Sequence, residues 1–173
     1  MRPNTLSDES CYFRTGGEQP LSRQALADVA GAILVRGAHF RFRARGWSMM
    51  PYIRDGDLLT LSPISGTLHS GDVVGFVHPP GDHLVVHRVI GRTVDGWLLR
   101  GDSLPEGDGR VDRVHILGRV TRVERGGRVV RFGLGPERAV IAWLSSHGLL
   151  CSTMEALRRL RGRIIRAEEG HDD

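Results

Sequence analysis

Five turn signals divide the middle of the chain into short apolar segments, and this spacing constrains the fold more than any other feature. They are Asp55-Gly56, Gly71-Asp72, Pro79-Pro80-Gly81, Asp95-Gly96 and Gly126-Gly127, combinations of the kind that close hairpins. Between them, apolar residues recur with the period of two that is typical of half-buried strands. The pattern predicts a mainly β fold, built as an antiparallel barrel or folded sheet.

The predicted strands begin where the apolar period changes from helical to two, after Gly37. From His39, Phe40, Phe42 and Ala44 alternate with arginines, which predicts a half-buried strand leading towards residue 48. Further strands are predicted near residues 58–61, 73–77, 83–90, 97–100, 116–123 and 128–132.

Helices are predicted on both sides of the strand region. Residues 21–36 carry one apolar stripe, and Ser22 is placed to cap the N-terminus of this helix. A second helix is predicted over about residues 137–166, and its last part has the leucines and arginines of a basic amphipathic helix. Its basic face is either a solvated surface or a peripheral contact with anionic membrane lipid.

The chain is long enough for one domain and has no convincing linker. We expect a flexible arm at residues 1–19, a β domain with its N-terminal helix at 20–136, and the C-terminal helix with a basic tail at 137–173. The N-terminus lacks an export signal, and the longest uncharged segment, 139–154, is shorter than the ~20 apolar residues of a membrane span. These features predict a cytoplasmic protein or one peripheral to a membrane.

All 24 basic residues are arginine, and the formal net charge is +4. Without an aromatic stacking platform or a recognition helix, this excess does not indicate nucleic-acid binding. Cys11 and Cys151 have no zinc-site spacing. His83 and His87 lie four apart on a predicted strand, about 13 Å from each other, and so do not share an ion. We predict no metal and no cofactor.

The absence of lysine restricts how a serine nucleophile is activated. A serine hydroxyl needs a base to take its proton, and arginine stays protonated. If Ser48, in the run Gly46–Pro51, is a nucleophile, a histidine must serve it. Several blocks follow that run in order: Asp55-Gly56-Asp57, Gly71-Asp72-Val73-Val74, Val85-Val86-His87-Arg88-Val89, Gly101-Asp102-Ser103 and Gly118-Arg119-Val120.

Together and in this order, these blocks resemble the type I signal peptidases, serine endopeptidases whose catalytic domain is a set of coiled antiparallel sheets. The resemblance covers roughly residues 40–120. At the position of His87 the common bacterial branch carries lysine, whereas the branch of the endoplasmic reticulum and archaea carries histidine. The chain is similar to the histidine branch, which implies a peptide or preprotein substrate.

The resemblance implies that Ser48 is the nucleophile, His87 the general base, and Asp102 and Asp108 the aspartates that complete the site. Asp112 is an alternative to Asp108. The strand pattern is consistent with His87 as the base, since a strand places Val85, His87 and Val89 on one face. An imidazole buried among apolar neighbours stays neutral and can accept the proton of Ser48, while an aspartate on its other nitrogen fixes the tautomer.

Further site residues follow from the run around Ser48. Met49, Met50 and Pro51 are expected to form an apolar substrate wall beside the hydroxyl. Many signal peptidases carry a serine two residues before the nucleophile, but this chain has Gly46. The developing oxyanion must then be bound by the backbone N–H of Ser48, aided by a neighbouring amide at or near Gly46.

Three other functions compete with leader-peptide cleavage. Autocleaving repressors share the sheet architecture and a Ser-Met motif, but they need a lysine base and an N-terminal helix-turn-helix. The chain offers an Ala30-Gly31 bond upstream of Ser48, within the apolar stripe of a predicted helix. A catalytically inactive family member would use the same groove to bind a peptide or a membrane partner. Nucleic-acid binding is supported only by the arginine excess.

Overall fold

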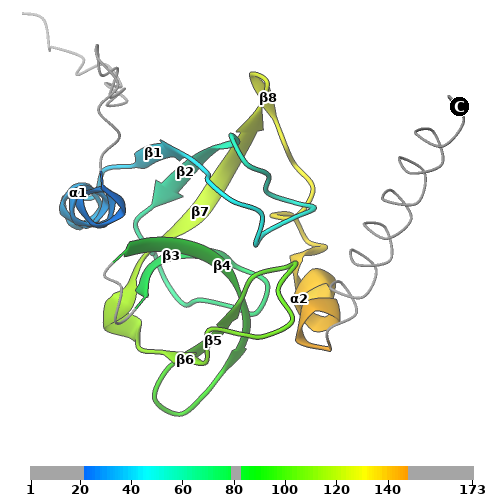
Figure 1. Cartoon of the computed structure of the whole chain (residues 1–173). Coiled ribbons are helices and arrows are strands. Elements are labelled where there is room, and N and C mark those ends of the chain that lie inside the picture. The colour runs from blue at the N-terminus through cyan, green and yellow to red at the C-terminus, as the bar shows by residue number, and fades with distance from the viewer. Residues whose placement is uncertain (1–21, 79–82, 148–173) are drawn as a thin grey trace, which may run out of the picture.

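The computed structural model describes residues 22–78 and 83–147. Its strands form an eight-stranded sheet in which every pair is antiparallel and which coils around the core (Figure 1). The strands are β1 (Phe40–Arg43), β2 (Leu58–Ser62), β3 (Val73–His78), β4 (His83–Arg92), β5 (Trp97–Arg100), β6 (Arg110–Val111), β7 (Ile116–Arg125) and β8 (Arg128–Val129). Their order is β1-β2-β7-β3-β4-β5-β6, with β8 paired to β7.

The predicted mainly β fold is confirmed, and β1 to β5 and β7 lie where the alternation placed them. β6 and the 3₁₀ helix Arg113–His115 were not predicted, because two residues are too short to show a period. The strand predicted over 128–132 ends at Val129, and Phe132 is exposed. Beyond Val129 the chain leaves the sheet to reach the second helix.

Strand β4 is buried on both sides. Leu84 and Val86 pack on a cluster that includes residues of the N-terminal helix, while Val85 and Val89 belong to a second cluster under β5 and β6. A strand covered on both faces has a nearly continuous apolar sequence, as 84–90 has apart from His87 and Arg88. These two polar side chains are 4% and 0% exposed, so each needs a buried partner.

Helix α1 (Arg23–Val35) confirms the predicted N-terminal helix. The hydroxyl of Ser22 accepts the N–H of Ala25 at 3.1 Å, which satisfies one of the N–H groups that a helix start leaves unpaired. Ala30 and Leu34 are buried against the sheet, and α1 packs on β4 and β7.

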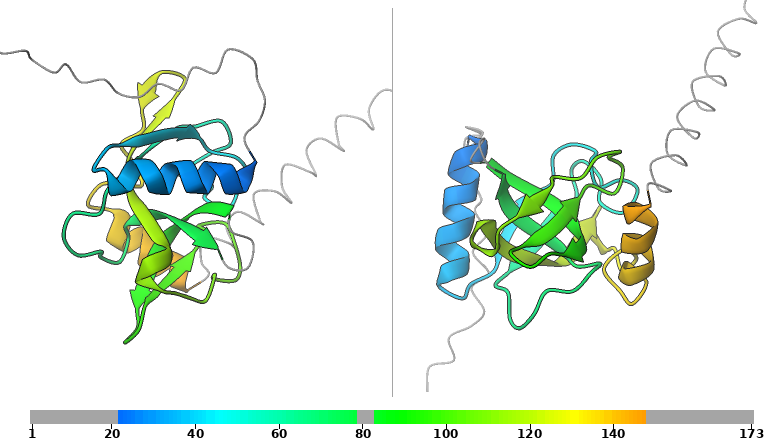
Figure 2. Two further views of the ribbon diagram at one scale, coloured as in Figure 1. Left: turned by 90° about the vertical axis from the view of Figure 1, so that its left-hand side faces the viewer. Right: turned by 90° about the horizontal axis from the view of Figure 1, so that it is seen from below.

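Helix α2 (Arg138–Ser146) lies on the opposite side of the sheet from α1 (Figure 2). It buries Ile141 and Ala142 and packs on β4. The predicted arm at 1–19, and the basic amphipathic part of the predicted C-terminal helix, lie outside the described residues. In the described part of the chain, neither helix is long and apolar enough to cross a membrane.

A bidentate ion pair ties the loop between β1 and β2 to the end of β7. Arg125 donates through Nε and Nη2 to the two carboxylate oxygens of Asp57, at 2.8 and 2.7 Å, and the N–H of Arg54 donates to Asp57 at 2.8 Å. Burial alone would raise the pKa of Asp57, but the hydrogen bonds from Arg125 and Arg54 outweigh it and hold that pKa below its usual value.

This ion pair predicts acid sensitivity of the fold. A carboxyl whose pKa is lower in the folded state contributes stability above its unfolded pKa, about 4, and loses it as the pH falls through the lower folded value. We expect the urea midpoint of the wild type to decrease between about pH 5 and about pH 3. In Asp57→Asn the midpoint should decrease less over the same range. The variant should also be less stable at pH 7, by ~2 kcal/mol. If the urea midpoint fell equally with pH in the wild type and in Asp57→Asn, the Asp57–Arg125 ion pair would not be the source of the acid sensitivity.

Candidate active site

Ser48 lies in a turn within the loop between β1 and β2, where its side chain is half-buried. The turn is closed by the N–H of Met50, which donates to the carbonyl of Trp47 at 3.1 Å, and by that of Ile53, which donates to Met49 at 3.0 Å. These bonds fix the direction of the chain on both sides of the serine.

Gly46 enters this turn with a φ of +96°, a left-handed conformation that favours glycine over serine. Its N–H donates to Oδ1 of Asp55 at 2.8 Å. The N–H that was expected to help bind the oxyanion is therefore occupied within the protein. The local backbone conformation also gives a physical reason for glycine at this position.

His87 is placed by β4 and is almost fully buried. Its Nδ1 lies 2.5 Å from Oδ2 of Asp108, and its ring is 5.9 Å from that of Phe76. The neighbours on its face of the strand, Val85 and Val89, belong to the same apolar cluster as Phe76. The surroundings of the imidazole thus match the prediction from strand alternation.

The contact with Asp108 selects the tautomer of His87. A carboxylate accepts hydrogen bonds, so Nδ1 carries the proton and donates it to Asp108. In the neutral ring Nε2 then keeps its lone pair, and among the described residues no group is hydrogen-bonded to it. The geometry therefore orients the imidazole so that Nε2 is the nitrogen available to accept a proton.

Gly101 brings the turn of Ser48 and the imidazole together. A Cβ atom at this glycine would lie 2.8 Å from the carbonyl oxygen of Ser48 and 3.0 Å from Nε2 of His87. Both atoms thus border the same small space, and only a glycine leaves it open. The backbone of Ser48 and the ring of His87, 39 positions apart in the sequence, therefore both approach Gly101.

Asp108 is held in place by the loop that follows β5. Its N–H donates to the carbonyl of Leu99 at 2.9 Å. Arg100 donates through Nε to Leu104 at 2.9 Å and through Nη2 to Pro105 at 2.5 Å, and so supports the middle of the loop. The other oxygen of Asp108 lies 4.0 Å from Nε2 of His78.

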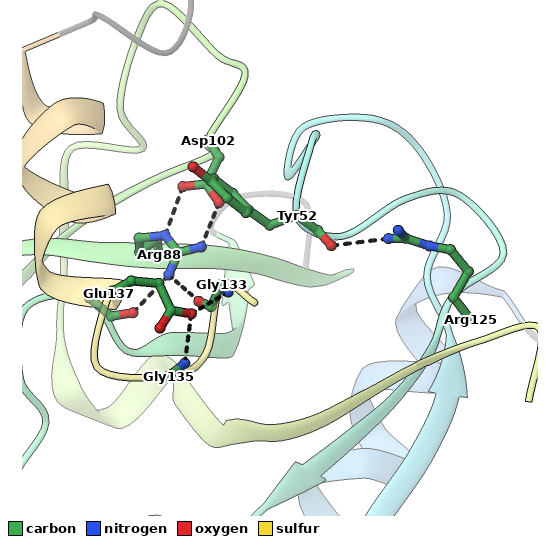
Figure 3. A network of polar contacts seen from close by, with 8 residues as sticks. Tyr52, Arg88, Asp102, Arg125, Gly133, Gly135 and Glu137 are labelled. Atoms are coloured by element: carbon green, nitrogen blue, oxygen red, sulfur yellow. Dashed lines mark hydrogen bonds and ion pairs between the residues drawn. The ribbon is translucent and has the colours of Figure 1, made fainter. Parts of the chain in front are cut away.

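Asp102 has a different partner from the one expected. Arg88 donates through Nε and Nη2 to its two oxygens, at 2.8 and 2.7 Å, and both side chains are fully buried. Figure 3 shows this pair together with the carbonyl of Gly133, to which Nη1 of Arg88 donates at 2.9 Å; Nη1 also donates to Gly71. Burial raises the pKa of Asp102, while Arg88 and, less strongly, His87 oppose that rise. Asp102 therefore anchors Arg88, and Asp108 contacts the imidazole.

The Arg88 network reaches α2 and the turn of Ser48. The guanidinium of Arg88 lies 5.4 Å from the ring centre of Tyr52, in the same loop as Ser48. Burial, with the nearby charges of Asp102 and Glu137, raises the pKa of Tyr52 against the effect of Arg88. Glu137 accepts the N–H groups of Gly133 and Gly135 (Figure 3), and these bonds lower its pKa.

The remaining predicted site residues are spread over different environments. Of the predicted substrate wall, Met49 is 4% exposed and packs in the larger core cluster, whereas Met50 and Pro51 are half-buried. Asp112 lies 3.5 Å from Nε of Arg110 with 45% of its side chain exposed. In residues 22–78 and 83–147, no group of three or more His, Cys, Asp or Glu side chains is arranged to hold a metal ion.

Two arginines that organise the site were not predicted. Arg88 lies directly after His87 in the otherwise apolar run 84–90 of β4, and a charged side chain in such a run was a signal that it needed a buried anion. Arg100, by contrast, gave no local signal, because its partners are backbone carbonyls of a loop.

Comparison with models of known protein families gives a match. The family model described as Peptidase S24-like matches residues 17–121. This range includes Ser48, His87, Asp102 and Asp108. Among curated proteins and among solved structures, no match was found.

Proposed function

Because this chain belongs to the Peptidase S24-like family, we propose that it is a serine endopeptidase that cleaves leader or signal peptides, with Ser48 as nucleophile and His87 as general base. The observation that carries the proposal is the arrangement of the imidazole. Nδ1 is hydrogen-bonded to Asp108, and Nε2 borders the turn of Ser48. Acyl transfer requires an oriented imidazole whose free nitrogen can take the proton of a serine hydroxyl.

In the proposed reaction, Oγ of Ser48 attacks the scissile carbonyl while Nε2 of His87 takes its proton. The electron pair of the C=O double bond moves to the oxygen, and the N–H of Ser48 stabilises the resulting anion. Asp108 stabilises the imidazolium that has formed. The imidazolium then gives its proton to the leaving amine as the peptide bond breaks. Water hydrolyses the acyl-enzyme in the same way and restores Ser48.

The position of the Ala30-Gly31 bond supports cleavage of a separate substrate over self-cleavage. The bond lies inside α1, and Ala30 is 0% exposed, packed in the larger core cluster. Cleavage there would require α1 to unfold and leave the sheet. The leader-peptide substrate rests on the order of the sequence blocks, which resembles that of the histidine branch of the signal peptidases.

The test is to incubate the purified protein with peptides that carry small residues before the scissile bond, and to follow both peptide and protein by mass spectrometry. The wild type is expected to cut the peptide and stay intact, and Ser48→Ala is expected to leave the peptide uncut. Cleavage should weaken on acidification, because a protonated imidazole accepts no proton.

Other outcomes assign other functions. Shortening of the protein itself, abolished by Ser48→Ala, would replace the proposal by self-cleavage. Peptide binding without any cleavage by the wild type would identify an inactive binding module.

A further inference from the structure

Ser103 holds the turn of Ser48 with two hydrogen bonds. Its N–H donates to the carbonyl of Ser48 at 2.9 Å, and its hydroxyl donates to the carbonyl of Trp47 at 2.7 Å. Ser103 is 6% exposed. It comes two residues after Gly101, whose lack of a side chain allows this segment to approach the backbone of Ser48. One residue therefore fixes two successive peptide units around the nucleophile.

The hydroxyl of Ser103, together with the N–H of Met50 (3.1 Å), holds the carbonyl of Trp47 and so sets the direction of a neighbouring N–H. In a trans peptide unit the C=O and the N–H point in opposite directions. The carbonyl of Trp47 and the N–H of Ser48 belong to one unit, so a carbonyl held towards Ser103 turns the N–H away from it. Among the described residues, no group accepts this N–H.

Gly46 does not provide a second hydrogen-bond donor for the oxyanion. That residue has no side chain, and its N–H donates to Asp55. The N–H of Ser48 lies beside the hydroxyl that would attack, where negative charge would develop. Its direction therefore matters more than that of other N–H groups in this loop.

We infer that Ser103 is a positioning residue that aims the backbone N–H of Ser48 at the oxyanion of the reaction. The inference rests on the proposed peptidase function and adds a residue to its machinery. Because Ser103 acts through Trp47 and Ser48 and does not touch the reacting atoms, it should affect the transition state and leave substrate binding unchanged.

Three substitutions separate this role from simple packing. Ser103→Ala removes the hydroxyl and keeps the backbone bond. Ser103→Cys fills nearly the same volume but has only a weak S–H donor, and Ser103→Thr retains the hydroxyl. If the hydrogen bond matters, threonine restores activity and cysteine does not; if only volume matters, cysteine restores it.

The experiment measures kcat and KM for a leader-type peptide, and Ki for the matching peptide aldehyde, which forms a tetrahedral adduct with a serine. For Ser103→Ala we expect kcat to fall about 10- to 100-fold and Ki to rise by a similar factor, with KM within about twofold. Ser62→Ala is the matched control, since Ser62 is equally buried (6% exposed) but lies on β2 and bonds to His39 and Thr121. It should leave all three constants unchanged.

The outcomes distinguish this inference from the function on which it rests. If the wild type cleaves and Ser103→Ala keeps its kcat within about twofold, or if cysteine restores the rate, the positioning role is overturned and the peptidase function stands. If threonine destabilises the fold, the alanine and cysteine variants and the aldehyde still decide the question. If the wild type cuts no peptide, both proposals fall.

Discussion

Replacing His87 by glutamine is expected to reduce kcat for peptide cleavage by about 10⁶-fold, the largest effect of any change proposed for this protein. The reason is that, in residues 22–78 and 83–147, His87 is the base whose ring approaches the turn of Ser48. The chain contains no lysine, and the space beside Gly101 is bordered by Nε2 of His87. Without this base the hydroxyl stays protonated at neutral pH and is a weak nucleophile.

Asp108→Asn should give a smaller loss, of about 10⁴-fold. An asparagine that donates its amide N–H to Nδ1 favours the opposite tautomer, in which Nε2 carries the proton and cannot act as a base. Rates of the wild type and both variants should be measured from about pH 5 to about pH 9. His39→Gln is a suitable control, because this exposed histidine bonds to Ser62 at the edge of the sheet.

Asp112→Asn tests whether a different aspartate is the functional partner of the imidazole. If Asp112→Asn reduced kcat as much as Asp108→Asn, the contact between Asp108 and His87 would not be the functional one. If His87→Gln kept most of the wild-type rate, the assignment of the base would be wrong.

Replacing Arg88 by methionine is expected to give the largest loss of stability, ~3–5 kcal/mol. The change leaves the carboxylate of Asp102 buried and unpaired, and it removes the hydrogen-bond donor of the carbonyls of Gly71 and Gly133. Arg88 is 0% exposed, so the groups that it contacts are shielded from bulk water. The melting temperature should fall by roughly 10 °C or more.

A double variant, Arg88→Met with Asp102→Leu, tests where this loss comes from. Two apolar residues can replace a buried ion pair at little cost, so part of the stability should return. The rest should stay lost, because the two carbonyls remain without their donor. Arg128→Met changes an exposed arginine on β8 and should shift the melting temperature little. Equal melting temperatures for Arg88→Met and the wild type would contradict the anchoring role.

Much of the fold was determined by local sequence. The alternation of apolar and polar residues gave the positions of β1 to β5 and β7, and Ser22 marked the start of α1, because strand period and helix capping depend on residues close in the chain. The candidates Ser48 and His87 also came from the sequence, since an all-arginine chain leaves histidine as the base for a serine.

Which aspartate contacts Arg88 and which contacts His87 was decided only by the tertiary structure. Asp102 and Asp108 are six residues apart and look alike in sequence, yet Asp102 pairs with Arg88 and Asp108 with His87. The fold of the loop after β5, supported by Arg100, turns the two carboxylates to different sides of β4. The burial of Met49 and the pairing of β6 arose in the same way, because long-range packing selects among local alternatives of similar energy.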